Sequence, residues 1–196
     1  AVDHVEYKDG TWSYTTVGNA VPTGLCGSGL IDLVAQLRKA ELIDESGHLE
    51  SGQKIPGRFV LVPPEKSANG KGVYLTQKDI GEVQLAKAAI AAGICLLMKQ
   101  LSITEEKIQT VYIAGAFGNY MNPKSAAMIG MLPESLLERI VPVGNAAGEG
   151  AKIALLNKKE RQEMNQTVGH MEFVELAVSP EFQDCFIDEL CFPELS

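Results

Sequence analysis

The hydrophobic positions of this chain change from a period of two to a helical period soon after residue 20. Residues 5–7 and 12–17 are rich in β-branched and aromatic side chains and enclose an Asp9-Gly10 pair, which predicts a β-hairpin. The apolar residues of 30–37 then recur at helical spacing, which predicts the first helix.

The rest of the chain alternates short β-branched runs with longer helical patterns, as is typical of α/β proteins. We expect strands over 58–62, 111–114, 140–143 and 171–177, and helices over 76–101, 123–131, 146–161 and 180–190. The hydroxyl of Thr76 is expected to cap the long helix, with Asp79 three residues later. Residues 44–72 are rich in Gly, Pro, Ser and Asn and are expected to form a surface loop region around the 58–62 strand.

Three glycine-rich turns, at residues 23–29, 114–119 and 143–150, each lead into an apolar helix. Glycine allows a ligand to approach the backbone, and the free N–H groups at a helix start favour anions. Repeated strand–glycine–helix units therefore predict a nucleotide or phosphate site at the ends of the strands. For any single turn the alternative stays open that its glycines only close a tight turn or a helix contact.

The second turn, residues 114–119, combines small residues with an aromatic ring and a side-chain amide. Gly115, Ala116 and Gly118 leave the backbone open to an adenine or ribose ring. Phe117 would add apolar surface and Asn119 a polar group. A Phe117 ring that points into the core is the alternative.

Two polar residues, Gln84 and Lys87, interrupt an otherwise apolar stretch between Val83 and Met98. A helix that is apolar all round is expected to be buried, and a buried lysine is costly without a partner. We therefore interpret Lys87 as a cation that faces a cleft and an anionic ligand, with Gln84 beside it one turn earlier. The alternative is a structural lysine that pairs with a carboxylate or extends to the surface.

Composition and charge narrow the class of protein. With 196 residues, 45% hydrophobic and 21% charged, the chain is typical of a globular protein of one domain or two small lobes. A net charge of −8 argues against nucleic acids and anionic membranes as partners. We recognise no apolar run whose length approaches the roughly 20 residues that span a bilayer. We also recognise no signal peptide, so the expected location is the cytoplasm.

The cysteines and histidines do not predict a metal site. The 4 cysteines form no C-x-x-C pair, and none of the 3 histidines lies at ligand spacing from another. Cys95 lies in an apolar run and is interpreted as an inert core residue. Cys26 precedes a helix start, where a thiolate is stabilised, although a plain buried thiol is the alternative. No Ser/His/Asp set or phosphate loop is present, so no catalytic residue is assigned.

Several motifs together resemble the reductive activators of corrinoid proteins. The motifs are residues 22–32, 75–80, Gln84-x-x-Lys87 with 88–90, 113–120, 143–148 and Phe192-Pro193. They cover the chain from about residue 20 to 193. That family resembles the superfamily of acetate and sugar kinases, Hsp-type chaperones and actin (ASKHA), in which two ribonuclease-H-like lobes enclose ATP.

The resemblance implies an α/β fold, a ribonuclease-H-like lobe of that superfamily. Residues 1–196 would be a single C-terminal nucleotide-binding domain of a longer protein, with 113–119 as the adenosine loop. The residue patterns above and this resemblance together give the expected nucleotide-binding residues, which are Gln84, Lys87, Gly115, Ala116, Phe117, Gly118, Asn119, Gly144 and Asn145, with Gly27, Ser28 and Gly29 as a phosphate position at a helix start.

The function implied by the resemblance is ATP-driven delivery of a low-potential electron. It would return the Co(II) corrinoid protein of a methyltransferase system to Co(I). The longer protein would bind ATP or ADP with Mg, whereas the Asp-x-Gly strand and the iron–sulfur domain of that family are not in this chain. We therefore expect this chain alone to bind no cofactor and to hydrolyse no ATP. The sequence Cys26-Gly27-Ser28-Gly29 departs from the Cys-x-Ala-Gly-type cluster motif of related activators.

Two other functions stay open at this point. A metabolite kinase of the same superfamily would share the adenosine loop but needs a catalytic carboxylate and sugar-binding residues that cannot be assigned here. A non-catalytic domain that docks a corrinoid protein would bind no ATP. The sequence leaves the oligomeric state open, a homodimer included.

Overall fold

The computed structural model describes residues 1–50, 57–176 and 178–195, except for the side chains of residues 116, 117 and 119. Its strands are β1 (Val2–Lys8), β2 (Thr11–Thr16), β3 (Arg58–Val62), β4 (Val73–Thr76), β5 (Val111–Ala114) and β6 (Ile140–Gly144). Its α-helices are α1 (Gly27–Lys39), α2 (Gln77–Leu101), α3 (Gly115–Tyr120), α4 (Pro123–Met128), α5 (Ala146–Leu156), α6 (Lys158–Val168) and α7 (Pro180–Asp188). This order of elements confirms the predicted α/β class.

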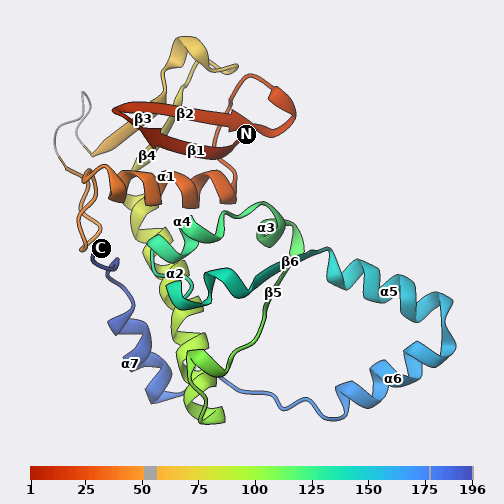
Figure 1. Cartoon of the computed structure of the whole chain (residues 1–196). Coiled ribbons are helices and arrows are strands. Elements are labelled where there is room, and N and C mark those ends of the chain that lie inside the picture. The colour runs from red at the N-terminus through yellow and green to blue at the C-terminus, as the bar shows by residue number, and fades with distance from the viewer. Residues whose placement is uncertain (51–56, 177, 196) are drawn as a thin grey trace.

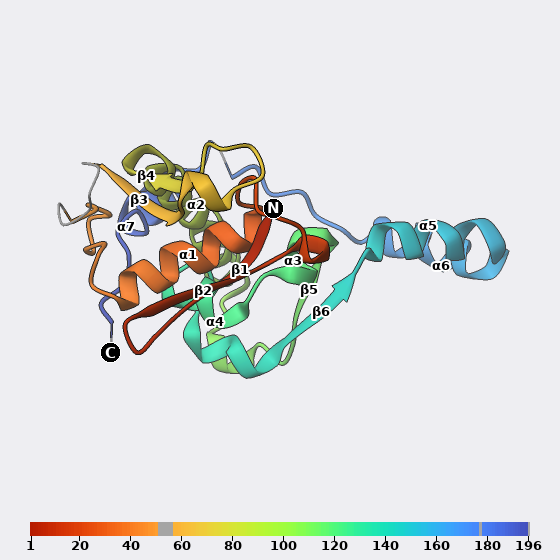
Figure 2. The ribbon, with the colours of Figure 1, turned by 90° about the horizontal axis from the view of Figure 1, so that it is seen from above.

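The strands pair two by two. β1 with β2 and β3 with β4 are antiparallel, whereas β5 and β6 are parallel. Figure 1 shows both antiparallel pairs beside α1 at one end of the long helix α2, with α7 along the other end. The α5 and α6 helices project from the rest of the molecule in both views (Figures 1 and 2).

The predicted hairpin is confirmed. Asp9 and Gly10, between β1 and β2, have φ angles of 49° and 77°. Positive φ at both central residues is what a two-residue type I′ turn requires, and Asp-Gly adopts it readily.

The edge of β1 that faces away from β2 is closed by side chains of α1. The Val5 N–H donates to Asp32 Oδ2 (3.3 Å), and the Tyr7 N–H donates to Gln36 Oε1 (3.0 Å). His4 Nδ1 is hydrogen-bonded to the same Asp32 oxygen. Because α1 packs along β1, residues one helical turn apart reach alternate N–H groups of the strand.

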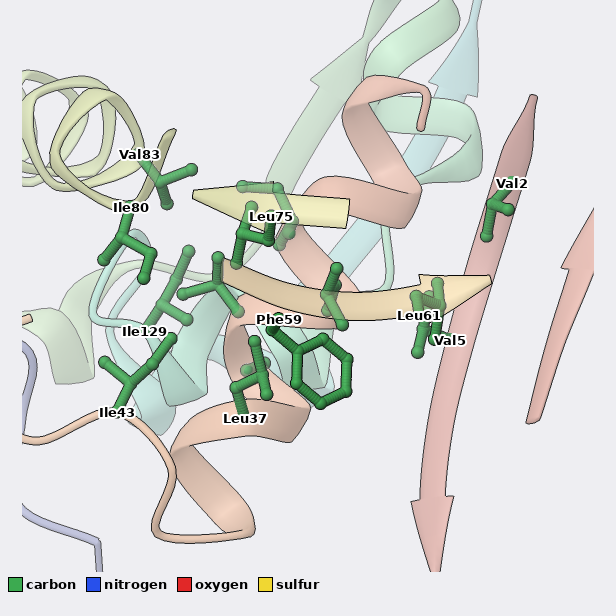
Figure 3. Packing of buried hydrophobic residues seen from close by; sticks show 14 of the residues in the cluster. Val2, Val5, Leu37, Ile43, Phe59, Leu61, Leu75, Ile80, Val83 and Ile129 are labelled. Carbon is green, nitrogen blue, oxygen red and sulfur yellow. The ribbon is translucent and has the colours of Figure 1, made fainter. Parts of the chain in front are cut away.

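The hydrophobic core forms where α1, the β3–β4 pair and the start of α2 meet. In Figure 3, Leu37 of α1, Phe59 of β3, Leu75 of β4 and Ile80 of α2 belong to one cluster, and none is more than 4% exposed. Burying side chains of this size contributes about 1.5–3 kcal/mol each. The cluster therefore fixes the start of α2 against α1.

The start of α2 is as predicted. The Asp79 N–H donates to Thr76 Oγ1 (3.2 Å), and the Thr76 N–H donates to Asp79 Oδ2 (2.8 Å). The two residues thus form a capping box that satisfies two backbone donors at the helix start.

The expectation that α2 is buried all round is wrong. Ile80, Val83, Ala88 and Leu96 are buried, whereas Leu85 and Leu101 are 48% and 66% exposed. The apolar sequence allows more than one face of α2 to be buried. Which face is buried depends on the elements that pack against the helix. Among the described residues only one face of α2 has such neighbours throughout.

By length and composition alone, α2 is apolar enough to cross a membrane, so the expectation of no such run is also wrong. Core helices of globular proteins pass the same test. Within the described residues, 33% of the most apolar window of α2 is buried. Within that apolar helix, the Gln84 and Lys87 side chains bond to the C-terminal segment (residues 189–195).

Two other expectations are corrected. The helix predicted over 146–161 is divided at Asn157, whose side chain accepts from the Lys159 and Glu160 N–H groups and caps α6. The strand predicted over 171–177 is not formed at residues 171–176, and residue 177 lies outside the described residues.

The structure also contains elements that the sequence did not predict. The short strand β4 and the helix α3 were not expected, and α4 ends three residues before the predicted residue 131. The predicted 58–62 strand is confirmed as β3 within the 44–72 loop region, of which residues 51–56 lie outside the description.

Candidate functional site

Two of the three glycine turns lie side by side at the carboxyl end of the β5–β6 pair. Ala114, directly before Gly115, is the register partner of Gly144. Gly115 and Gly144 have φ angles of 92° and 59°, and nothing lies within 4 Å of the position that a Cβ would take. Glycine adopts this backbone conformation without strain. The two strand ends therefore present open backbone where α/β proteins bind ligands.

The remaining residues of the second turn form α3. A Cβ on Gly118 would lie 2.1 Å from Ile113 Cγ2, so this glycine allows α3 to pack on β5. The structure does not describe the side chains of Ala116, Phe117 and Asn119. The contact of Phe117 with an adenine therefore stays a prediction.

Asn145 begins α5 at the end of β6. Its side-chain oxygen accepts from the Gly148 N–H (3.0 Å), which makes it the cap of this helix. A Cβ on Gly148 would lie 2.4 Å from the Asn145 amide nitrogen, so glycine leaves room for the cap. The side chain of Asn145 is thus held beside the open backbone of Gly144.

In the first turn the helix start is packed against β1. The Ser28 hydroxyl donates to Asp3 O (2.9 Å). A Cβ on Gly29 would lie only 2.3 Å from Val2 O. Ser28 and Gly29 are buried by these contacts and only Gly27 is exposed, which fits the alternative of a helix contact. The phosphate role predicted for the three residues is not tested.

The first turn nevertheless lies close to the other two. α1 contacts α3, and Figure 2 shows the start of α1 beside α3 and the ends of β5 and β6. The three turns are therefore on neighbouring elements, as the predicted fold requires.

Gln84 and Lys87 bind other parts of the chain. The Gln84 amide donates to Ser46 O and Leu190 O, both at 3.0 Å. The Lys87 ammonium donates to Cys191 O (2.5 Å). Among the described residues, neither polar side chain hydrogen-bonds to the turns at Gly115 and Gly144, and the contact of Gln84 and Lys87 with a nucleotide stays a prediction.

Lys87 is 1% exposed, and its surroundings account for the buried charge. Its Nζ lies 3.7 Å from Glu189 Oε2 and 6.0 Å from the centre of the Phe192 ring. Burial lowers the pKa of Lys87, and the charge of Glu189 partly opposes that shift. This is the carboxylate pairing that was the structural alternative for Lys87.

A cavity of about 720 Å³ lies between α2, α4 and the C-terminal segment. Apolar side chains such as Ile94, Met98 and Met128 line it, together with Glu105 and Glu189. None of the predicted nucleotide-binding residues whose side chains the structure describes lies in its wall. Among the residues described, no group of three or more His, Cys, Asp or Glu could hold a metal ion.

Comparisons with known proteins identify relatives over the whole chain. A family model described as the C-terminal domain of RACo, the ASKHA domain, matches residues 1–196. A solved structure of a reductive activator for corrinoid, iron-sulfur protein superimposes with a TM-score of 0.91 at 36% identity. That match covers 98% of this chain and 32% of the activator.

Two curated proteins are also similar. The corrinoid activation enzyme RamQ from Eubacterium limosum is 33% identical over 207 residues, which cover 98% of this chain and 35% of that protein. A Co(II) methylated amine-specific corrinoid protein reductase from Methanosarcina barkeri is 26% identical, covering 86% of this chain and 29% of the reductase. The chain thus spans about a third of the length of these relatives.

Proposed function

This chain belongs to the family of RACo C-terminal domains, which have the ASKHA fold, and from that membership we propose that it is the nucleotide-binding part of an ATP-dependent reductive activator. The full-length protein would transfer one electron to a Co(II) corrinoid protein of a methyltransferase system and so produce Co(I). The names of the relatives support a corrinoid protein as the partner. The electron would come from an iron–sulfur domain elsewhere in the full-length protein.

One observation carries the nucleotide part of this proposal. Gly115 and Gly144, at register-paired strand ends, both have positive φ and open space in place of a Cβ. This arrangement fits a nucleoside that lies over bare backbone at the carboxyl edge of a parallel pair. Asn145 supplies a polar side chain beside it. ATP with Mg would supply the free energy that drives the electron to a low potential, with its phosphates held by residues outside these 196.

The alternatives receive less support. The relatives are named as corrinoid activators and not as kinases, and no described residue favours a sugar site. A docking domain without nucleotide is separated from our proposal by nucleotide titration. All four cysteines are free, which supports the reducing cytoplasm as the location.

The Asn145→Asp variant of the full-length protein tests the nucleotide site. Aspartate keeps an oxygen that caps the Gly148 N–H, but it adds a negative charge beside the proposed phosphate-bearing ligand. We expect ATP to bind about tenfold more weakly, equivalent to about 1.4 kcal/mol. ATP-dependent formation of Co(I), followed by visible absorbance, should need correspondingly more ATP.

Asn157→Asp is the matched control, since Asn157 caps α6 in the same way on the projecting helix pair. It adds the same charge and should leave ATP affinity unchanged. Equal effects of the two variants, or no ATP binding by the unmodified protein, would contradict the proposed site. Corrinoid reduction without any dependence on ATP would contradict the proposed function.

A further inference from the structure

Two cysteines from separate helices meet beside a lysine. Cys95 of α2 and Cys185 of α7 have their sulfur atoms 3.0 Å apart. The Lys99 ammonium donates to Cys185 Sγ at 3.3 Å. Neither cysteine is in a disulfide, so the pair is present as thiols beside a cation.

Burial and hydrogen bonding within the cluster act on Cys95 and on Lys99. Burial and the hydrogen bond with Cys185 raise the pKa of Cys95, which therefore keeps its proton. The same cluster raises the pKa of Lys99, because its ammonium is hydrogen-bonded to Cys185. Cys185 Sγ thus lies within hydrogen-bond distance of two groups, the Cys95 thiol and the Lys99 ammonium.

A small oxidant has a route to the pair. Cys95 lines the cavity of about 720 Å³ and also a second one of about 580 Å³. Cys185 itself is 5% exposed. The pair is therefore open, through Cys95, to a molecule such as hydrogen peroxide.

We propose that Cys95 and Cys185 are a redox-responsive pair that hydrogen peroxide converts into a disulfide between α2 and α7. One sulfur of the pair attacks a peroxide oxygen, which leaves a sulfenic acid, and the proton of that thiol goes with the departing hydroxide to give water. The other sulfur then attacks the sulfenic sulfur, and the hydroxyl group leaves as a second water with the proton of the second thiol. Two thiols and one peroxide thus give one disulfide and two molecules of water.

The disulfide would reach beyond the two cysteines. α7 ends at Asp188 and leads directly into Glu189 and Cys191, the partners of the Lys87 ammonium. Tying α7 to α2 therefore holds the C-terminal segment over Lys87.

The pair is tested in the full-length protein by brief exposure to hydrogen peroxide, blocking of the remaining thiols with N-ethylmaleimide, and tryptic digestion without reduction. Trypsin cuts after Lys87, Lys99 and Arg161, so the cross-link joins peptide 88–99 to the peptide that begins at Gln162. That second peptide also contains Cys191, so Cys191→Ser is the matched control.

We expect the cross-linked peptides in the unmodified protein and in Cys191→Ser, and none in Cys95→Ser or Cys185→Ser. Lys99→Gln should slow the reaction about threefold, because it removes the cation that lies beside the pair and stabilises negative charge on the reacting sulfur. Lys99→Arg, which keeps the charge, should not. Loss of the cross-link in Cys191→Ser, or oxidation of the two thiols without a cross-link, would overturn the proposal.

Discussion

Replacement of Gly29 by alanine is expected to destabilise the packing of α1 on β1 by about 2–4 kcal/mol. The added Cβ would lie 2.3 Å from Val2 O and 2.9 Å from Val2 C. Both are backbone atoms of Val2, a buried residue of β1, and cannot move aside as a side-chain end would. Hydrogen exchange over residues 2–8 and 27–39 of the full-length protein should become about thirty- to a thousandfold faster.

Gly81→Ala is the matched control for this change. Gly81 is also inside a helix, but nothing lies within 4 Å of its Cβ position. At position 81, alanine should stabilise the protein by about 0.5–1 kcal/mol because its helix propensity is higher than that of glycine. If Gly29→Ala stabilised the protein as Gly81→Ala does, the close contact between α1 and β1 would be refuted.

Lys87→Ala is expected to destabilise the contact between α2 and the C-terminal segment by about 3 kcal/mol. Lys87 is among the largest fully buried side chains, and alanine would leave a cavity beside Phe192. Lys87→Met keeps the packing of the stem. The Lys87→Met variant loses a hydrogen bond but no longer buries a charge, so the protein should be destabilised by less than about 1.5 kcal/mol.

Hydrogen exchange of residues 189–195 and ATP affinity, measured on both variants, distinguish the two interpretations of Lys87. Because the ammonium already binds Cys191 O and lies near Glu189, ATP affinity should change less than about twofold. If Lys87→Met instead left hydrogen exchange normal and weakened ATP binding about ten- to a hundredfold, that result would support a direct contact between Lys87 and the nucleotide.

Short sequence patterns were enough to predict the turns and helix starts that depend only on residues close by in the sequence. Asp9-Gly10 defines a turn by its own backbone preference, and Thr76 with Asp79 defines a helix start by two hydrogen bonds three residues apart. Such features need no tertiary partner, and the structure confirms both.

Elements that depend on a partner could not be predicted in this way. Four of the six residues 171–176 are apolar, but a strand needs another strand beside it, and Phe173 is 86% exposed. β4, with only four residues, is a strand because it pairs with β3. Asn157 interrupts a continuous helical pattern because its side chain caps the next helix.

The candidate site was predicted in part for the same reason. Strand order alone places the ends of β5 and β6 together, so Gly115 and Gly144 could be paired from the sequence. The anomaly of Lys87 was visible in the sequence, but its hydrogen-bond partner Cys191 lies 104 positions later. Cys95, interpreted as an inert core residue, meets Cys185 across 90 positions.

The side chains that close the edge of β1 also bear on self-association. Exposed strand edges with free N–H groups are where folded chains add to one another and aggregate. On β1, Asp32 and Gln36 already accept the N–H groups of Val5 and Tyr7. A second chain would have to displace both side chains before it could add a strand there, so α1 protects this edge against edge-to-edge aggregation.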